Sequence, residues 1–121
     1  DCRDKTCVTP ICAGLEFVRQ VKPVRFNWKL RDTDSSHPRW MMPDAGFLAQ
    51  DLLDLVNEYS VSQGYDAKAQ LKLAHDLDPD SLEIDPGRLV PILVKAVQEL
   101  AQANEDLVNR VTALEAKLNT Q

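Results

Sequence analysis

The chain has 121 residues, enough for one small domain with a helical extension. Hydrophobic residues make up 44% and charged residues 27%, proportions that are ordinary for a globular protein. A formal charge of −5 argues against nucleic acid as a partner, because phosphate binding needs a basic surface. No apolar run approaches the roughly 18 to 20 residues of a membrane span, so we expect no membrane partner.

Three cysteines lie near the N-terminus, at Cys2, Cys7 and Cys12. Their spacing differs from that of zinc sites, which usually pair cysteines about two to four residues apart. A fourth ligand would have to be His37 or His75, both far along the chain. An odd count also argues against a disulfide framework. We therefore expect reduced thiols, no metal and no cofactor, and the spacing gives no support to a cysteine hydrolase.

The first regular elements are expected between residues 13 and 31. Residues 13–22 are apolar at helical spacing and predict a short helix, which Pro23 ends. Residues 24–31 alternate apolar and polar side chains, which predicts a strand with one buried face. The residues on that face are Val24, Phe26, Trp28 and Leu30.

The middle of the chain predicts shorter elements. Residues 32–38 have loop composition, 45–49 predict a short strand, and 60–70 are polar and irregular. Residues 50–59 predict an amphipathic helix. Its apolar side carries Leu52, Leu53, Val56 and Tyr59.

Two further strands, 71–74 and 82–84, are expected on either side of the turn Asp78-Pro79-Asp80. A long helix should then begin near residues 88–90, because Pro91 fits only in a first helical turn.

This last helix keeps a strict heptad repeat to the end of the chain. The a positions are Val90, Val97, Asn104, Val111 and Leu118, and the d positions are Leu93, Leu100, Leu107, Leu114 and Gln121. An apolar seam that repeats every 3.5 residues predicts a coiled coil with partner helices.

The number of helices is left open by the residues themselves. β-branched residues at a, Leu at d and a buried Asn favour a coiled coil of two helices. Apolar residues at the e and g positions widen the stripe and suit three or more helices. These are Val94, Ala101 and Val108 at e, and Ala96 and Ala103 at g. A helix that packs only onto its own domain is the remaining alternative.

Residues 14–29, 46–51 and 89–100 together resemble one family, the C-terminal intramolecular chaperone domain of phage endosialidases, tailspikes and tail fibres. The resemblance covers nearly the whole chain. It implies an α+β fold, with residues 1–87 as a small globular chaperone and autoprotease part. Residues 88–121 would form the long helix of a trimeric coiled coil, which moves the expected state to a homotrimer.

That family begins at a Ser-Asp-x-Arg-x-Lys motif, which Asp1, Arg3 and Lys5 match. The family cuts itself after the Ser, so the resemblance implies cleavage immediately before Asp1, with the Ser one residue upstream and absent here. The family chemistry is a serine-type Ser–Lys dyad, in which Lys5 would be the catalytic base. A lysine can act as a base only in its neutral form.

Arg25, Asn27 and Gln50 are polar residues inside the matched segments. Each could line the cleavage site, and each could equally satisfy backbone groups near a strand end. No glycine-rich phosphate loop is present, so we expect no nucleotide.

The resulting hypothesis is an intramolecular chaperone that trimerises, assists folding of an upstream tail fibre or tailspike, and is released by autoproteolysis. Its partners would be two copies of itself and the upstream fibre segment of its own precursor. It would act in the cytoplasm of the infected bacterial host during virion assembly and be absent from the mature fibre. The alternative is a plain coiled-coil oligomerisation cap with neither chaperone nor proteolytic activity.

Overall fold

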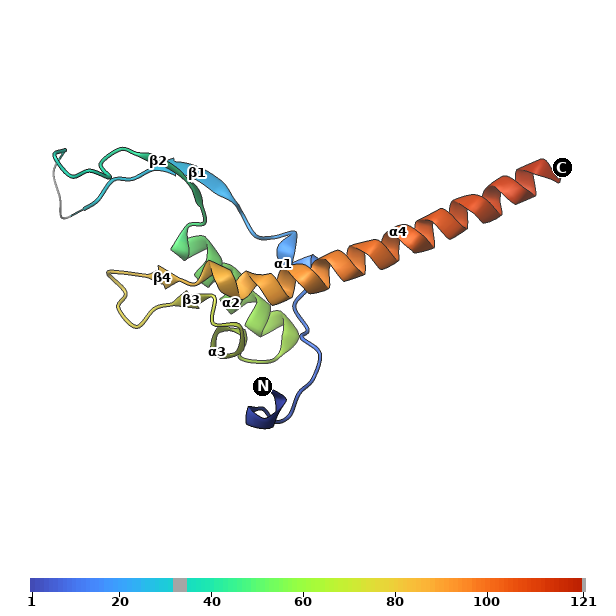
Figure 1. Cartoon of the computed structure of the whole chain (residues 1–121), viewed down its shortest axis with the longest axis horizontal. Helices are drawn as coiled ribbons and strands as arrows, with labels where there is room; N and C mark the ends of the chain where they lie inside the picture. The colour runs from blue at the N-terminus through green and yellow to red at the C-terminus, as the bar shows by residue number, and fades with distance from the viewer. Residues whose placement is uncertain (32–34, 121) are drawn as a thin grey trace. The chain divides into compact units, whose positions relative to one another are not determined.

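The computed structural model describes residues 1–31 and 35–120. Short helices and two small sheets precede one long helix, α4, Leu89–Asn119 (Figure 1). The expected α+β class with a long C-terminal helix is confirmed. The chain divides into two compact units, one of Asp1–Arg19 with Leu89–Gln121 and one of Gln20–Arg88. Residues 1–19 thus group with α4, and the proposed domain boundary after residue 87 stays a prediction.

The unit of residues 20–88 opens with an antiparallel pair, β1 (Val24–Asn27) and β2 (Pro43–Gly46). The ladder is shorter than the expected strand 24–31, although the Trp28 N–H still donates to the Met42 carbonyl at 2.9 Å. The predicted alternation is confirmed, because its four apolar residues are half-buried and Arg25, Asn27 and Lys29 are exposed. The strand expected at 45–49 lies two to three residues earlier, since Ala49 already begins a helix. Of the expected loop 32–38, residues 32–34 lie outside the described part.

Helix α2 (Ala49–Gln63) confirms the helix expected at 50–59 and continues one turn further. The irregular segment expected at 60–70 is wrong, since α3 (Ala67–Leu71) follows directly. The polar residues there are helix caps. Asp66 caps α3 by accepting from the Ala69 N–H at 3.1 Å, and Ser60 Oγ accepts from the Ala67 N–H at 2.9 Å. Gly64 ends α2 in the left-handed region, at φ 72°.

The core of this unit lies between α2, α3 and a second small sheet, β3 (Ala74–His75) paired with β4 (Glu83–Ile84). Strand β4 is one residue shorter than the expected 82–84. The strand expected at 71–74 is wrong except at Ala74, because Leu71 still belongs to α3 and Lys72 ends that helix. The turn between β3 and β4 is confirmed, because the Asp78 carbonyl accepts from the Ser81 N–H at 3.0 Å. Leu53, which was expected on the apolar side of α2, is only half-buried. Leu55, which was not expected there, is buried. The buried residues are Leu52, Leu55, Val56, Tyr59, Ala67, Leu71, Leu73 and Ala74.

The other unit contains a 3-10 turn, η1 (Cys2–Asp4), the single-turn helix α1 (Leu15–Val18), and α4. The helix expected at 13–22 is only this one turn, because a short helix needs tertiary packing and few of its side chains are buried. A further 3-10 turn, η2 (Pro86–Arg88), precedes α4. Helix α1 packs against α4 (Figure 1). The unit's buried apolar residues are Ala13, Phe17, Leu89, Ile92 and Ala96.

Among the described residues, no helix has the length and apolar character needed to cross a membrane.

Candidate functional site

The residues of the N-terminal motif share one exposed turn. Asp1 is the N-cap of η1, and its carboxylate accepts from the Arg3 backbone N–H at 2.9 Å. The same carboxylate accepts from Arg3 Nε at 3.0 Å and forms an ion pair with Arg3 Nη2 at 2.5 Å. Lys5 ends the turn, where its backbone N–H donates to the Cys2 carbonyl at 3.3 Å. The structure therefore brings Asp1, Arg3 and Lys5 together.

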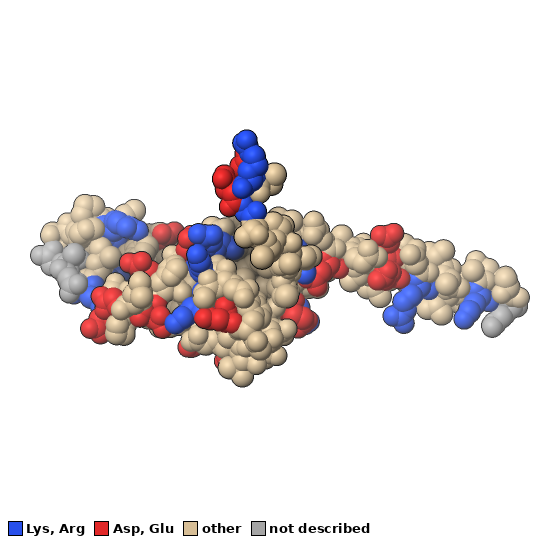
Figure 2. Space-filling view, turned by 90° about the horizontal axis from the view of Figure 1, so that it is seen from below, with Lys and Arg blue, Asp and Glu red and all other residues tan. Residues whose placement is uncertain are grey.

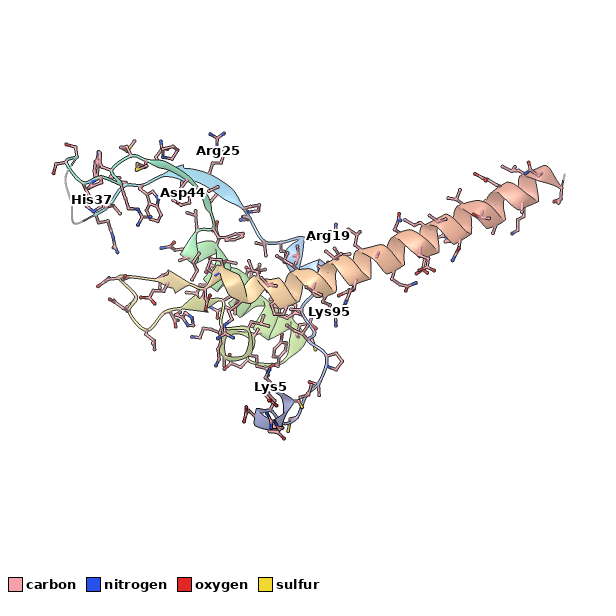
Figure 3. The ribbon with its side chains drawn as sticks, in the orientation of Figure 1. Lys5, Arg19, Arg25, His37, Asp44 and Lys95 are labelled. Carbon is pink, nitrogen blue, oxygen red and sulfur yellow. The ribbon has the colours of Figure 1, made fainter. Side chains whose placement is uncertain are left out.

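Lys5 itself is exposed, beside the N-terminal turn (Figure 3). Within residues 1–31 and 35–120, its ammonium forms no hydrogen bond and no ion pair. The amine is therefore accessible to solvent. Its catalytic role stays a prediction.

The three cysteines are free, exposed thiols: Cys2 lies within this turn, and Cys7 and Cys12 follow it along the chain. Cys7 adopts a positive φ of 54°, which is uncommon for a residue with a side chain. In the part of the chain that the structure describes, no group of His, Cys, Asp and Glu could hold a metal ion.

Arg25 and Asn27 lie on the exposed face of β1, in the unit of residues 20–88 (Figure 3 labels Arg25 and Asp44). Together with Phe26, Pro43 and Asp44 they line a shallow groove over the β1–β2 pair. Gln50 is exposed in the first turn of α2 and does not line this groove. Because Lys5 belongs to the other unit, a joint site with these residues stays a prediction.

Sequence reasoning missed a cluster formed by Trp28, Arg39 and Asp44 beside that groove. Trp28 Nε1 donates to Asp44 Oδ2 at 3.1 Å, and the Arg39 guanidinium lies 4.4 Å from the centre of the Trp28 ring. These contacts join the Trp28 side chain to Asp44 of β2 and to Arg39, and an alternating strand pattern gives no sign of them.

The apolar face of α4 is exposed along its length. Ten large apolar side chains on this helix are between 43% and 71% exposed. They are Val90, Leu93, Val94, Val97, Leu100, Leu107, Val108, Val111, Leu114 and Leu118. Asn104 is exposed among them, and the last d position, Gln121, lies outside the described residues. In Figure 2, acidic and basic groups are spaced along the distal helix, with uncharged surface between them. Contiguous exposed apolar faces are typical of surfaces that bind other proteins.

Lys95 and Gly14 were also missed by sequence reasoning. Lys95, labelled on α4 in Figure 3, donates from Nζ to the Ile11 carbonyl. Gly14 is buried, and a Cβ there would come within 1.9 Å of Glu99 Oε1. A lysine inside the apolar run 89–97 is the one signal that could have indicated this contact.

Comparison with known proteins identifies the N-terminal half. Residues 1–60 match the model of the family Peptidase_S74, which is described as "Chaperone of endosialidase". The first part of that name classifies the family among serine-type peptidases. No curated protein and no solved structure matches the chain. The match contains the Asp1–Lys5 turn, α1, the β1–β2 pair and most of α2. The chain therefore belongs, through residues 1–60, to the chaperone of endosialidase family.

Proposed function

We propose that this chain is a C-terminal intramolecular chaperone that trimerises through α4, assists folding of an upstream tail fibre or tailspike, and is released by self-cleavage immediately before Asp1. The observation that carries the proposal is the exposed apolar face of α4 in a chain of this family.

Two further copies of the chain are the proposed occupants of that face. A helix of 31 residues is about 46 Å long, and residues 101–119 are exposed on all its sides. Apolar residues at the a and d positions match the repeat that coiled coils bury. Val94 and Val108 at e widen the face beyond a two-helix seam and favour three helices.

Trimerisation of α4 would explain how the chain assists folding of the upstream segment. Three upstream chains joined to one coiled coil meet at a high effective concentration. Pairing of strands from different chains otherwise requires a large loss of chain entropy before any contact compensates for it. The trimer therefore lowers the entropic barrier to folding of the upstream fibre.

Self-cleavage would follow once the fibre has folded. In the net reaction, water hydrolyses the peptide bond before Asp1. The C–N bond breaks, the water hydroxyl joins the upstream carboxyl group, and a proton goes to the Asp1 amine. The neutral amine of Lys5 would act as the base that accepts a proton during this hydrolysis, with the preceding Ser hydroxyl as its dyad partner. Release leaves the fibre kinetically trapped in its folded state. These steps would take place in the cytoplasm of the infected bacterial host, and the mature fibre would lack the domain.

The test uses a fibre precursor that carries a Ser before Asp1, with Lys5→Ala compared with Lys22→Ala. Lys22 is also an exposed lysine and forms no ion pair among the described residues. We expect Lys5→Ala trimers to stay uncleaved and Lys22→Ala trimers to release the fragment, as followed by mass spectrometry. Release at the wild-type rate from Lys5→Ala would show that the dyad assignment is wrong.

A plain oligomerisation cap is the second candidate, because α4 alone would account for it. The two functions differ in the mass of the mature fibre, since a cap stays attached. They differ also when residues 1–121 are deleted from the precursor. A chaperone predicts insoluble or non-trimeric fibre, and soluble native trimers would contradict that role.

A further inference from the structure

The chain that follows the proposed cleavage point is first held at residues 11–14. Residues 1–10 are exposed, Ile11 is half-buried, and Ala13 and Gly14 are buried. Ten residues of extended chain can span about 33 Å. Without an anchor, the bond before Asp1 could therefore occupy many positions relative to α4.

Lys95 provides a polar anchor for this segment. Its half-buried side chain leaves α4 and donates from Nζ to the Ile11 carbonyl, which is partly buried as well. A partly buried carbonyl that loses its donor is destabilised, because water replaces the lost bond only incompletely. Hydrogen bonds from a charged donor are also stronger than those between neutral groups.

Gly14 provides a steric match one helical turn along α4. Its backbone lies so close to α4 that a Cβ would come within 1.9 Å of Glu99 Oε1 and 3.1 Å of Lys95 Cγ. Both side chains belong to the same face of α4, since they are four residues apart. Only glycine allows this approach without displacing them.

This contact, which we call the Lys95 latch (Ile11, Gly14, Lys95 and Glu99), lies beside the apolar face of α4. Pro10 and Ile11 form one side of a groove whose other side includes Val94 and Gln98. The same two α4 residues also line a second groove with Val90, Leu93 and Val97. One helix thus presents the latch and the proposed trimer surface on adjoining sides.

We propose that Lys95 is a positioning residue for self-cleavage. It fixes residues 11–14 to α4, so that Lys5 and the bond before Asp1 are confined to the reach of the ten preceding residues, about 33 Å from that point on the helix. The inference rests on the proposed function, because it assumes that the chain cleaves itself. Lys95 acts through the backbone and does not touch the reacting atoms.

The experiment measures the rate of fragment release from purified precursor trimers. Lys95→Met keeps most of the aliphatic stem and removes the donor, Lys95→Arg keeps a charged donor, and Lys22→Met is the control. We expect Lys95→Met to release the fragment about tenfold to a hundredfold more slowly, as for other small losses of alignment. Lys95→Arg should recover to within about threefold of wild type, and Lys22→Met should match wild type. Trimer mass should be the same in all four proteins.

Several outcomes would overturn the inference and leave the proposed function intact. These are wild-type release from Lys95→Met trimers, equally slow release from Lys95→Arg trimers, and loss of trimers in Lys95→Met, which would give Lys95 a structural role. Failure of the proposed function looks different, because the wild-type precursor would then not release the fragment, or Lys5→Ala would release it normally.

Discussion

At the scale of single residues, the pair formed by Lys68 and Asp76 has a definite pH signature. Lys68 Nζ donates to the two carboxylate oxygens of Asp76 at 3.0 and 3.3 Å. This hydrogen bond, helped by the charge of Lys68, lowers the pKa of Asp76 below its ordinary value of 3.8. The ionised carboxylate is therefore favoured by the folded chain.

The sign of the pH dependence follows from that lowered pKa. The pair's contribution to the free energy of unfolding is fully present above pH 3.8, and it is lost as the pH falls through the lower pKa of the folded state. We expect Lys68→Met to destabilise the chain by a constant amount above about pH 5 and by progressively less below pH 3.8. Urea unfolding at several pH values, with Lys22→Met as control, measures this difference. A difference that grows on acidification would contradict the assignment.

The candidate site was predictable from sequence only where its residues form a local motif. Asp1, Arg3 and Lys5 lie within five positions, and the structure places them in one turn. The bond from Lys95 to the Ile11 carbonyl joins residues 84 positions apart. A backbone carbonyl carries no side-chain signature, so no pattern in the sequence could pair these two residues.

At the scale of elements, helix α2 depends on Gly64 for its end. Gly64 has φ 72°, and its N–H donates to the Ser60 carbonyl at 2.9 Å. We expect Gly64→Ala to destabilise the folded chain by about 1 kcal/mol, because the left-handed conformation is unfavourable for a residue with a Cβ. A Cβ at this position meets nothing within 4 Å, so the cost is that of the backbone alone.

A matched control for this substitution is Gly87→Ala. A Cβ at Gly87 would make only ordinary contact with Asp85 Oδ1, at 3.6 Å, and its φ is not in the left-handed region. Gly87→Ala should leave the melting temperature unchanged or raise it slightly. Thermal unfolding of both variants by circular dichroism, at one protein concentration, tests the comparison. Equal effects of the two substitutions would exclude the conformational explanation.

The long periodic elements were predicted well and the short ones poorly. Helices α2 and α4 were expected because many turns repeat the same apolar spacing. Helix α3 was missed because its caps, Ser60 and Asp66, make a segment look like loop when only composition is read. The strand ends were displaced because pairing partners, and not the pattern of one strand, decide where a ladder stops.

At the scale of the whole molecule, we expect one substitution on the apolar face of α4 to disrupt the proposed trimer. Leu107 is a d-position residue and 56% exposed in the single chain, whereas Asn109 lies two residues further along the helix, at an outer position. We expect Leu107→Asp to give single chains, because three carboxylates would be buried at one level of the coiled coil. Asn109→Asp introduces the same residue and should leave trimers intact.

Light scattering of the isolated chain measures this effect. Wild type and Asn109→Asp should have three times the mass of one chain, and Leu107→Asp the mass of one. The mass also decides between two and three helices, which Asn104 and the apolar e positions leave open. Trimers of Leu107→Asp would show that another surface holds the copies together.

The distal part of α4 differs from the rest of the chain in what depends on it. All residues from 101 to 119 are exposed, whereas the buried residues of this helix, Leu89, Ile92 and Ala96, belong to its first turns. None of the described residues 101–119 is buried in the single chain, so we expect this part of the helix to be replaceable. Whole heptads can be added, removed or replaced by another coiled coil of chosen strand number without altering the residues that fold the remainder. Changing the length of this helix would then adjust how firmly the copies of the proposed trimer are joined, independently of the proposed cleavage before Asp1.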